Sequence, residues 1–313
     1  MFEQILLAIR AHDRIILHRH KNPDGDAMGS QIGLKHLILE NFPGKEVLMV
    51  GDSAGRYGFM EDSVMDEVAD EAFADALCII LDCSATHLIS DERYSLAKTT
   101  ARMDHHLFCG QIAQLEAVDS SRESCCGLIA KMAKENGLAL NPLAAKSLYT
   151  GMITDSGRFR YDSVDAETLS LASFLRQQSF DTESIYRGLY AEDLRYLQSK
   201  AKFLLKIQVS EGGVAYIYTD AQEVAALDMD IFSISRGMVG TMSDLKGVDI
   251  WVNFTESDQG VLCELRSSRY NINPIAVRYG GGGHAKASGA CVADRETAMN
   301  MLRDLERLQE ETN

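Results

Sequence analysis

The residues best suited to chemistry lie near the N-terminus, where His20, Asp24 and Asp26 follow one another in the spacing His-x3-Asp-x-Asp. Imidazole and carboxylate groups are ligands for hard and borderline divalent cations. An apolar segment precedes them, a Pro-Asp-Gly turn carries them, and a helical pattern follows from Ala27 to about residue 41, so we expect a strand, a loop and a helix. Open α/β sheets place their sites on such loops. For this segment alone, a solvated turn beside an unrelated histidine is an equal alternative.

Three later segments repeat this arrangement of polar groups at the ends of predicted elements. Asp82 follows an apolar run over residues 76–81, of the kind buried on both faces of a parallel sheet. Asp104, His105 and His106 follow a predicted strand over residues 99–103, and Asp155 lies at the end of a predicted helix that begins at Pro142. Because a doubly wound domain assembles its site from several strand and helix ends, the recurrence favours one shared site.

The elements that must position these groups alternate between strand and helix in the first part of the chain. An amphipathic N-terminal helix, the predicted strands and the intervening helices indicate an α/β fold with a doubly wound, mainly parallel sheet over residues 1–190, including a helical connection from about residue 180. Residues 191–313 differ, because predicted hairpins near residues 212 and 258 and a final helix over about 294–309 indicate a smaller α/β domain with antiparallel pairing. We expect a cleft between the two domains.

The second domain contains two further candidate motifs. Arg266, Ser267 and Ser268 lie just past a predicted strand, and four glycines from Gly280 precede His284. Backbone N–H groups in a glycine-rich loop can surround a phosphate, and arginine offers a bidentate fork to the same group. The alternative is a flexible loop without a ligand. We favour phosphate binding by Gly281, Gly282, Gly283 and His284 because ordering four adjacent glycines costs backbone entropy.

Composition restricts the class of protein and of substrate. The 313 residues are 46% hydrophobic and carry a net charge of −15, with no apolar run near the roughly 20 residues of a membrane span. Such an acidic surface disfavours long nucleic acids, which bind tracks of Lys and Arg, so any nucleic-acid substrate should be short. The seven cysteines are odd in number and include no Cys-x2-Cys pair, which disfavours disulfides and zinc ribbons. With no signal peptide, we expect a cytoplasmic protein.

Taken in order, these motifs resemble those of the DHH phosphoesterase superfamily, and Gly280 to His284 resembles its DHHA1 domain. The similarity spans most of the chain. The length of the chain and its Arg-Ser-Ser motif resemble those of the subgroup of oligoribonucleases (nanoRNases) and 3′,5′-bisphosphate nucleotidases. Met28 and Ser156 depart from residues common in relatives, but neither occupies a ligand position.

The resemblance implies a site for two metal ions. His20 and Asp24 match ligands of the first ion, Asp26, His105 and Asp155 match ligands of the second, and Asp82 matches the bridging ligand. Oxygen and imidazole ligands without thiolate suit Mn2+, with Mg2+, Fe2+ or Co2+ as alternatives. Four carboxylates balance the charge of two divalent cations, which would activate a water for in-line attack on phosphorus.

The roles of the neighbouring side chains follow the same resemblance. His106 matches a catalytic residue that contacts the scissile phosphate or protonates the leaving oxygen, although a supporting contact to Asp104 or to a ligand is the alternative. Asp104 is expected to support the loop. Arg158 and Arg160 are candidates for phosphate contacts, with surface ion pairs equally plausible.

The resemblance therefore implies a hydrolase of phosphoric esters that acts on very short oligoribonucleotides and on adenosine 3′,5′-bisphosphate. The second domain would bind the distal nucleotide, and no membrane or long nucleic-acid partner is expected; a homodimer is left open. Alternatives are a phosphodiesterase for cyclic or linear di-AMP and a family-II inorganic pyrophosphatase, which lacks the tetraglycine segment. A nucleotide-binding regulatory module is the alternative from a different class. Metal-dependent turnover separates it from the enzymes.

Overall fold

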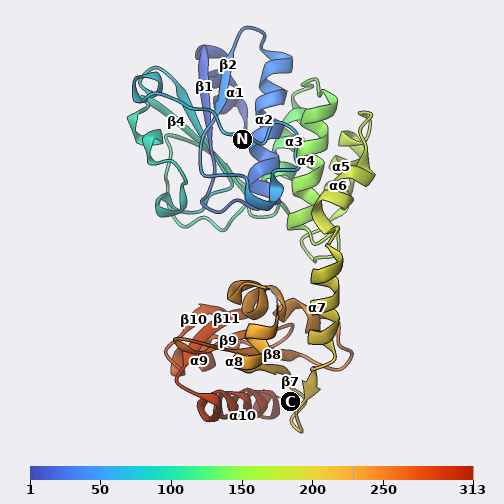
Figure 1. Cartoon of the computed structure of the whole chain (residues 1–313). Coiled ribbons are helices and arrows are strands. Elements are labelled where there is room, and N and C mark those ends of the chain that lie inside the picture. The colour runs from blue at the N-terminus through green and yellow to red at the C-terminus, as the bar shows by residue number, and fades with distance from the viewer. Residues whose placement is uncertain (228, 313) are drawn as a thin grey trace. The chain divides into compact units, whose positions relative to one another are not determined.

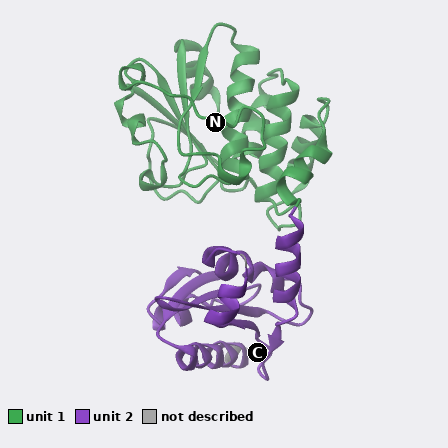
Figure 2. Ribbon diagram, in the orientation of Figure 1, with its two compact units in different colours: residues 1–191 green, residues 192–313 purple. Residues whose placement is uncertain are grey.

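The computed structural model of the protein describes residues 1–227 and 229–312. The chain divides into two compact units, residues 1–191 and 192–313, shown in green and purple in Figure 2. Each unit contains a sheet with helices packed against it (Figure 1). Among the described helices, none has both the length and the apolar character needed to cross a membrane.

The first unit is built on a five-stranded sheet in which every strand pair is parallel, in the order β2-β1-β3-β4-β5. Its strands are β1 Arg14–His18, β2 Glu46–Met49, β3 Leu77–Leu81, β4 Thr99–Asp104 and β5 Leu115–Val118. Every residue of β3 is buried, as expected for a central strand with both faces covered. The predicted α/β fold with a parallel N-terminal sheet is confirmed.

The two faces of this sheet are covered differently. Leu17 and Ile79 join the main core, formed with helices α1 Glu3–Ala11, α2 Gly25–Asn41, α3 Cys125–Glu135, α4 Pro142–Asp155, α5 Ala166–Leu175 and α6 Thr182–Tyr190. Ile16 and Cys78 point to the other face, where they pack with Phe73. Phe73 ends one of the short 3-10 helices, η2 Asp70–Phe73, that with loops cover this second face. This alternation follows from the two-residue period of a strand.

Helices α2 and α4 approach each other closely because glycines of α2 face α4. A Cβ on Gly25 would lie 2.5 Å from Thr154, and one on Gly29 would lie 2.6 Å from the carbonyl oxygen of Ser147. A Cβ on Gly33 would lie 2.5 Å from Leu148. The start of α2 therefore lies beside the end of α4, and the close packing brings their termini together.

The second unit is built on a six-stranded sheet in the order β10-β11-β9-β8-β7-β6. Its elements are α7 Leu194–Leu204, β6 Gln208–Val209, β7 Ala215–Thr219, α8 Ala221–Ala226, the π-helical turn η5 Ser233–Gly237, β8 Ile250–Ser257, β9 Gly260–Ser267, α9 Asn273–Arg278, β10 Gly282–His284, β11 Ala287–Val292 and α10 Arg295–Thr312. The predicted hairpins β6–β7 and β8–β9 are confirmed as antiparallel pairs. The pairing of β7 with β8 is parallel, which the sequence did not indicate.

Candidate active site

The structure brings together all six residues that the sequence analysis assigned to metal ions. Potential ligand atoms lie within 4.8 Å of one another in two groups that match that assignment: His20, Asp24 and Asp82 form one, and Asp26, His105 and Asp155 form the other. Asp82 also lies within this distance of His105 and His106. Asp82 is therefore placed between the two groups. We call these six residues the acidic cluster.

The fold explains why segments so distant in sequence meet. Asp82 lies directly after β3, and His20 lies two residues past β1, at the same edge of the sheet. In the strand order 2-1-3-4-5 the chain changes direction between β1 and β3, and α/β proteins place ligands at this switch point. Asp24 is the N-cap of α2, and Asp155 is the last residue of α4, which packs against α2.

Asp82 has an unusual backbone and an unusual environment. Its φ of 51° lies in the left-handed region, which is costly for a residue with a Cβ, and functional sites are common locations for such strain. The side chain is buried, with Oδ2 3.5 Å from His20 Nε2 and Oδ1 3.4 Å from His105 Nε2. Oδ1 accepts no hydrogen bond from the described residues. A buried carboxylate oxygen without a hydrogen-bond donor is suited to a cation.

Both imidazoles of the acidic cluster are oriented by backbone carbonyls. Nδ1 of His20 donates to the carbonyl of Lys21 at 2.8 Å, and Nδ1 of His105 donates to the carbonyl of Arg122 at 3.3 Å. Because a carbonyl only accepts, each Nδ1 carries the proton and each Nε2 points at the carboxylates. Histidine ligands of metals in proteins are commonly held in this way.

Asp26 is held by the N-terminus of α3, a contact that the sequence analysis missed. The Asp26 side chain is fully buried, and its two oxygens accept hydrogen bonds from the backbone N–H groups of Cys125 at 2.7 Å and Cys126 at 2.9 Å. A helix N-terminus favours a negative group. Ser124, the N-cap before an apolar helical pattern, was the available signal for this helix.

The pKa values show that the acidic cluster attracts positive charge. Burial, together with the Asp82 carboxylate, raises the pKa of Asp26 well above its usual range, and burial beside Asp82 and Asp24 raises the pKa of Asp155 to about 7. Burial alone would lower the pKa of both histidines, but the neighbouring carboxylates raise it to about 11 for His20 and about 10 for His105. Without cations, protons compensate the carboxylates, so this donor set fits divalent cations.

His106 lies beside the acidic cluster, in contact with Asp104. Asp104 is buried and ion-paired with the buried Arg102. Its Oδ1 accepts hydrogen bonds from the backbone N–H of His105 at 3.0 Å and from Nδ1 of His106 at 2.7 Å. The hydrogen bond to Asp104 raises the pKa of His106. It uses Nδ1 of the ring, so Nε2 is not involved in it. Asp104 thus orients the loop and the imidazole ring.

Arg19 and Asp52 form a second supporting contact that the sequence analysis did not identify. The fully buried Arg19 pairs with Asp52 at 2.6 Å and donates to the carbonyl of His20 at 3.1 Å and to Gln31 Oε1 at 3.1 Å. These contacts fix the backbone that carries His20. Arg19 directly follows β1, and nothing in the sequence indicates its partner, which lies after β2.

In the second unit, the Arg-Ser-Ser segment lies at the end of β9. Arg266 pairs with Glu264 at 3.1 Å, and Ser267 Oγ accepts hydrogen bonds from the backbone N–H groups of Arg269 at 3.1 Å and Tyr270 at 2.7 Å. Ser268 Oγ donates to Asp249 Oδ1 at 3.2 Å. The two serine hydroxyls therefore stabilise the turn after β9, while Arg266 lies partly exposed at its start.

The expectation of a glycine-rich loop is wrong for Gly282, Gly283 and His284, which form strand β10 and pair with β11. A Cβ on Gly283 would lie 2.6 Å from the carbonyl oxygen of Ala287, and one on Gly281 would lie 2.0 Å from that of Gly289. Glycine is needed here because the two backbones approach closely. The pairing of β11 with β9, with Ala287 opposite Arg266, places the end of β10 near the Arg-Ser-Ser segment.

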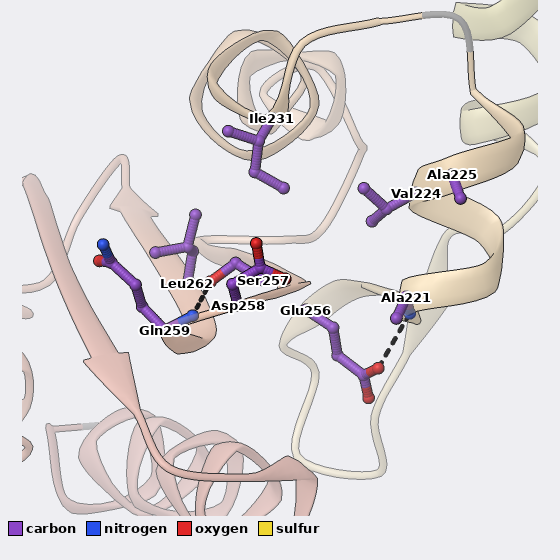
Figure 3. Close-up of a pocket in the computed structure, with 9 residues that line it drawn as sticks. All are labelled: Ala221, Val224, Ala225, Ile231, Glu256, Ser257, Asp258, Gln259 and Leu262. Atoms are coloured by element: carbon purple, nitrogen blue, oxygen red, sulfur yellow. Dashed lines mark hydrogen bonds between the residues drawn. The ribbon is translucent and has the colours of Figure 1, made fainter.

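A separate pocket in the second unit contains none of the predicted site residues (Figure 3). It has a volume of about 560 Å³ and is lined by apolar side chains of α8, Ile231 and Leu262 and by polar side chains at the β8–β9 turn. Glu256, at its edge, accepts hydrogen bonds from the Tyr218 hydroxyl at 2.7 Å and the Ala221 N–H at 2.9 Å. Its carboxylate is therefore already engaged.

Comparison with known proteins identifies the two domains. Residues 14–152 match the N-terminal domain of the DHH family, and residues 224–311 match the DHHA1 domain. The chain is 32% identical to a protein of Bacillus subtilis named bifunctional oligoribonuclease and PAP phosphatase NrnA, over 99% of each chain. It is also 32% identical to a Streptococcus mutans protein named as the probable equivalent, over 97% of this chain and 98% of the relative.

A solved structure supports the fold. The exopolyphosphatase-related protein of Bacteroides fragilis superposes with a TM-score of 0.85 at 24% identity, covering 98% of this chain and 95% of the other. The sequence matches over nearly the whole chain establish the family. The chain belongs to the DHH phosphoesterases, metal-dependent hydrolases of phosphoric esters, and consists of a DHH domain followed by a DHHA1 domain.

Proposed function

We propose that the acidic cluster binds two divalent cations, Mn2+ in preference to Mg2+, Fe2+ or Co2+. His20 and Asp24 would hold the first, Asp26, His105 and Asp155 the second, and Asp82 both. The observation that carries this proposal is the convergence of these side chains from separate segments into two groups of ligand atoms, with Asp82 of one group also close to His105 of the other. Oxygen and imidazole donors without thiolate suit these ions.

Bound there, the cations supply positive charge for the phosphoryl oxygens and lower the pKa of the attacking water. The remaining steps belong to side chains of the DHH domain. His106, with Nδ1 fixed by Asp104, presents Nε2 for a hydrogen bond to the scissile phosphate or for protonation of the leaving oxygen. Its raised pKa keeps a proton available for that transfer. We therefore assign His106 as the catalytic side chain.

The proposed substrates are very short oligoribonucleotides and adenosine 3′,5′-bisphosphate. Relatives of 32% identity over nearly the whole chain carry both activities in their name, and the net charge of −15 disfavours a long polyanion. In the DHHA1 domain, Arg266, Ser267, Ser268, Gly281, Gly282, Gly283 and His284 are the candidates for binding the distal nucleotide. We place the enzyme in the cytoplasm.

The test is a substrate panel with the full-length chain and Mn2+. It comprises dinucleotides to pentanucleotides, a long RNA, adenosine 3′,5′-bisphosphate, cyclic di-AMP and pyrophosphate. We expect dinucleotides and the bisphosphate to be hydrolysed, with rates falling steeply beyond about five nucleotides, because the acidic surface offers no track for a longer chain. Preference for pyrophosphate or cyclic di-AMP would replace the proposed substrate, and rapid decay of the long RNA would contradict the length limit.

Asp82→Ala tests the metal assignment. We expect loss of turnover with every substrate and loss of the thermal stabilisation that Mn2+ gives the wild type, since a ligand bound by the native state raises its stability. Exchange of a surface carboxylate, Asp13→Ala, is the control. Robust hydrolysis by Asp82→Ala, or by the wild type in excess chelator, would contradict the two-metal site.

Arg266→Ala tests the role of the DHHA1 domain. Loss of a charge-assisted contact should lower kcat/KM for dinucleotides, by an amount that corresponds to about 1.5 to 3 kcal/mol of binding free energy. Hydrolysis of bis-p-nitrophenyl phosphate, which has no distal nucleotide, should change little. Unchanged dinucleotide kinetics would remove Arg266 from the proposed binding site.

A further inference from the structure

Beside the acidic cluster, the first unit contains a group of aromatic and guanidinium side chains, of which only Arg158 has been named above, as a candidate for a phosphate contact. We call it the aromatic–arginine wall, and it consists of Arg56, Tyr57, Arg158, Tyr161, Tyr186 and Tyr190. The Arg158 guanidinium carbon lies 4.8 Å from the centroid of the Tyr190 ring, whose centroid is 6.1 Å from that of Tyr186. The Arg56 guanidinium carbon lies 5.2 Å from the Tyr57 centroid.

The two parts of the wall are connected. Arg56 donates a hydrogen bond to the carbonyl of Leu189 at 3.1 Å, which ties it to the end of α6 next to Tyr190. Burial raises the pKa of Tyr190, and the charges of both Arg158 and Arg56 oppose this shift, so both guanidinium groups lie near its hydroxyl. The wall is therefore one continuous surface of rings and cations.

The wall adjoins the acidic cluster at two points. The Asp24 carboxylate and the backbone N–H of Gly25 both influence the pKa of Tyr57, so the Tyr57 hydroxyl lies next to the start of α2. The Tyr161 ring lies against Gly157, two residues past Asp155, where a Cβ would be 2.5 Å from the ring. A ligand bound at the acidic cluster thus has aromatic rings next to it within the same unit.

Except for the buried Tyr57, the wall is exposed to solvent, and it is cationic, in contrast to the chain as a whole. Tyr161 is 58% exposed and Tyr190 is 40% exposed. Arg56 and Arg158 are exposed, and neither pairs with a carboxylate within the described part of the chain. Unpaired guanidinium groups are notable in a protein with a net charge of −15. Rings interleaved with guanidinium groups are the usual means of binding single-stranded nucleic acid.

The backbone that carries Arg158 is strained. Gly157, Arg158 and Phe159 have consecutive φ values of 56°, 64° and 59°, in the region that favours glycine. The turn is held by the backbone N–H of Arg158, which donates to the carbonyl of Ile153 at 2.8 Å, and by that of Phe159, which donates to Ser156 Oγ at 2.9 Å. Such a conformation persists only where the surroundings impose it, and here it carries Arg158 to Tyr190.

We propose that the aromatic–arginine wall binds the nucleoside next to the scissile phosphate. Its base stacks on the exposed rings of Tyr161 and Tyr190, and Arg56 and Arg158 contact the adjoining phosphate. Stacking accepts every base, so this subsite is insensitive to sequence. The proposal rests on the proposed function, because it presumes a short oligonucleotide at the acidic cluster.

The test compares a dinucleotide with an analogue that lacks the base next to the scissile phosphate. With the full-length wild type and Mn2+, we expect removal of the base to raise KM about 5- to 150-fold, as loss of one stacked base should. In the double variant Tyr161→Leu/Tyr190→Leu this ratio should fall to about one. The double variant Tyr161→Phe/Tyr190→Phe, which keeps the rings, should retain the wild-type ratio.

Arg158→Gln should raise KM for both substrates. Arg10→Gln is its matched control, because Arg10 covers the ring of Phe42 at 5.9 Å, beyond the far end of α2. A leucine double variant that still distinguishes the two substrates as the wild type does would overturn the proposal.

The outcome is separable from that of the proposed function. If the wild type does not hydrolyse the dinucleotide, the proposed function fails. Calorimetric binding of the same two compounds to the same variants then tests the wall. Equal affinity of the wild type for both compounds would overturn the proposal that the aromatic–arginine wall binds the base.

Discussion

The close packing of α2 against α4 predicts that one added methyl group at Gly29 will damage the acidic cluster. A Cβ at Gly29 would lie 2.6 Å from the carbonyl oxygen of Ser147, and 3.0 Å from Cys126 Sγ. Ordinary contact begins at 3.4 Å, so the helices must separate by about 0.8 Å. The obstacle is backbone and cannot move away by rotation of a side chain.

The expected magnitude is the difference between two effects of Gly29→Ala. Overpacking in a core costs about 1 to 3 kcal/mol. Alanine is favoured over glycine in a helix by about 1 kcal/mol. We therefore expect the free energy of unfolding to fall by up to about 2 kcal/mol. Separation of the helices also moves Asp24 and Asp26 away from Asp155, and a 1 Å misplacement in an active site can cost about 100-fold in rate.

The assay combines urea unfolding with kcat/KM for a dinucleotide in Mn2+. Gly240→Ala is the control, because a Cβ there meets no atom within 4 Å and the φ of Gly240 is ordinary. The control should keep full activity and gain slightly in stability. A Gly29→Ala variant that is more stable than the wild type and fully active would refute the reasoning, because helix propensity alone would then describe the position.

Two further predictions concern groups away from the acidic cluster. Of the seven cysteines, exposed Cys109 and Cys291 should react with Ellman's reagent in the native protein, whereas the buried thiols should react only on unfolding, since burial raises the pKa to about 12 for Cys78 and Cys263 and to about 11 for Cys83. More than two fast thiols would contradict the packing of the core. Asp165, the N-cap of α5, accepts a hydrogen bond from the Thr168 N–H and pairs with Arg122, which lowers its pKa to about 2. A carboxylate whose pKa is lowered in the folded state stabilises the fold fully at pH values above its unfolded-state pKa, near 4. This stabilisation is lost as the pH falls through the folded-state pKa of about 2. Asp165→Asn keeps the capping oxygen but removes the charge of this exposed carboxylate. We therefore expect the free energy of unfolding in urea to fall by only about 0.5 to 1 kcal/mol at pH 7, and by less below pH 4. A decrease that does not depend on pH would contradict this prediction.

The parts of the site that could be predicted from the sequence are those fixed by local pattern. Asp82 was identified because a wholly apolar run ends there, and such a run is a central strand whose end lies at the sheet edge. His20 and Asp155 were identified in the same way, from the ends of a strand and a helix. The family resemblance added the grouping of these residues into two sets of ligands.

The contacts that were missed depend on groups that the sequence does not specify. Every residue except proline has a backbone N–H, so nothing in the sequence marks those of Cys125 and Cys126 as the donors to Asp26. The strand Gly282–His284 was taken for a loop because glycine disfavours strands in general. Its stability comes from pairing with β11, and that close approach is a property of the tertiary fold.

The basic residues next to the acidic cluster explain why it remains available to cations. Arg19 precedes His20 in sequence, yet its guanidinium is taken up by Asp52. Arg102 lies on the strand before His105 and is taken up by Asp104. Among the charges that most affect the pKa of Asp26, Asp82 and Asp155, the positive ones all belong to histidines. A histidine can release its proton when a cation arrives, whereas an arginine cannot. Each of these buried arginines therefore pairs with a carboxylate outside the acidic cluster. The negative charge of the cluster is balanced instead by histidine protons, which a cation can displace.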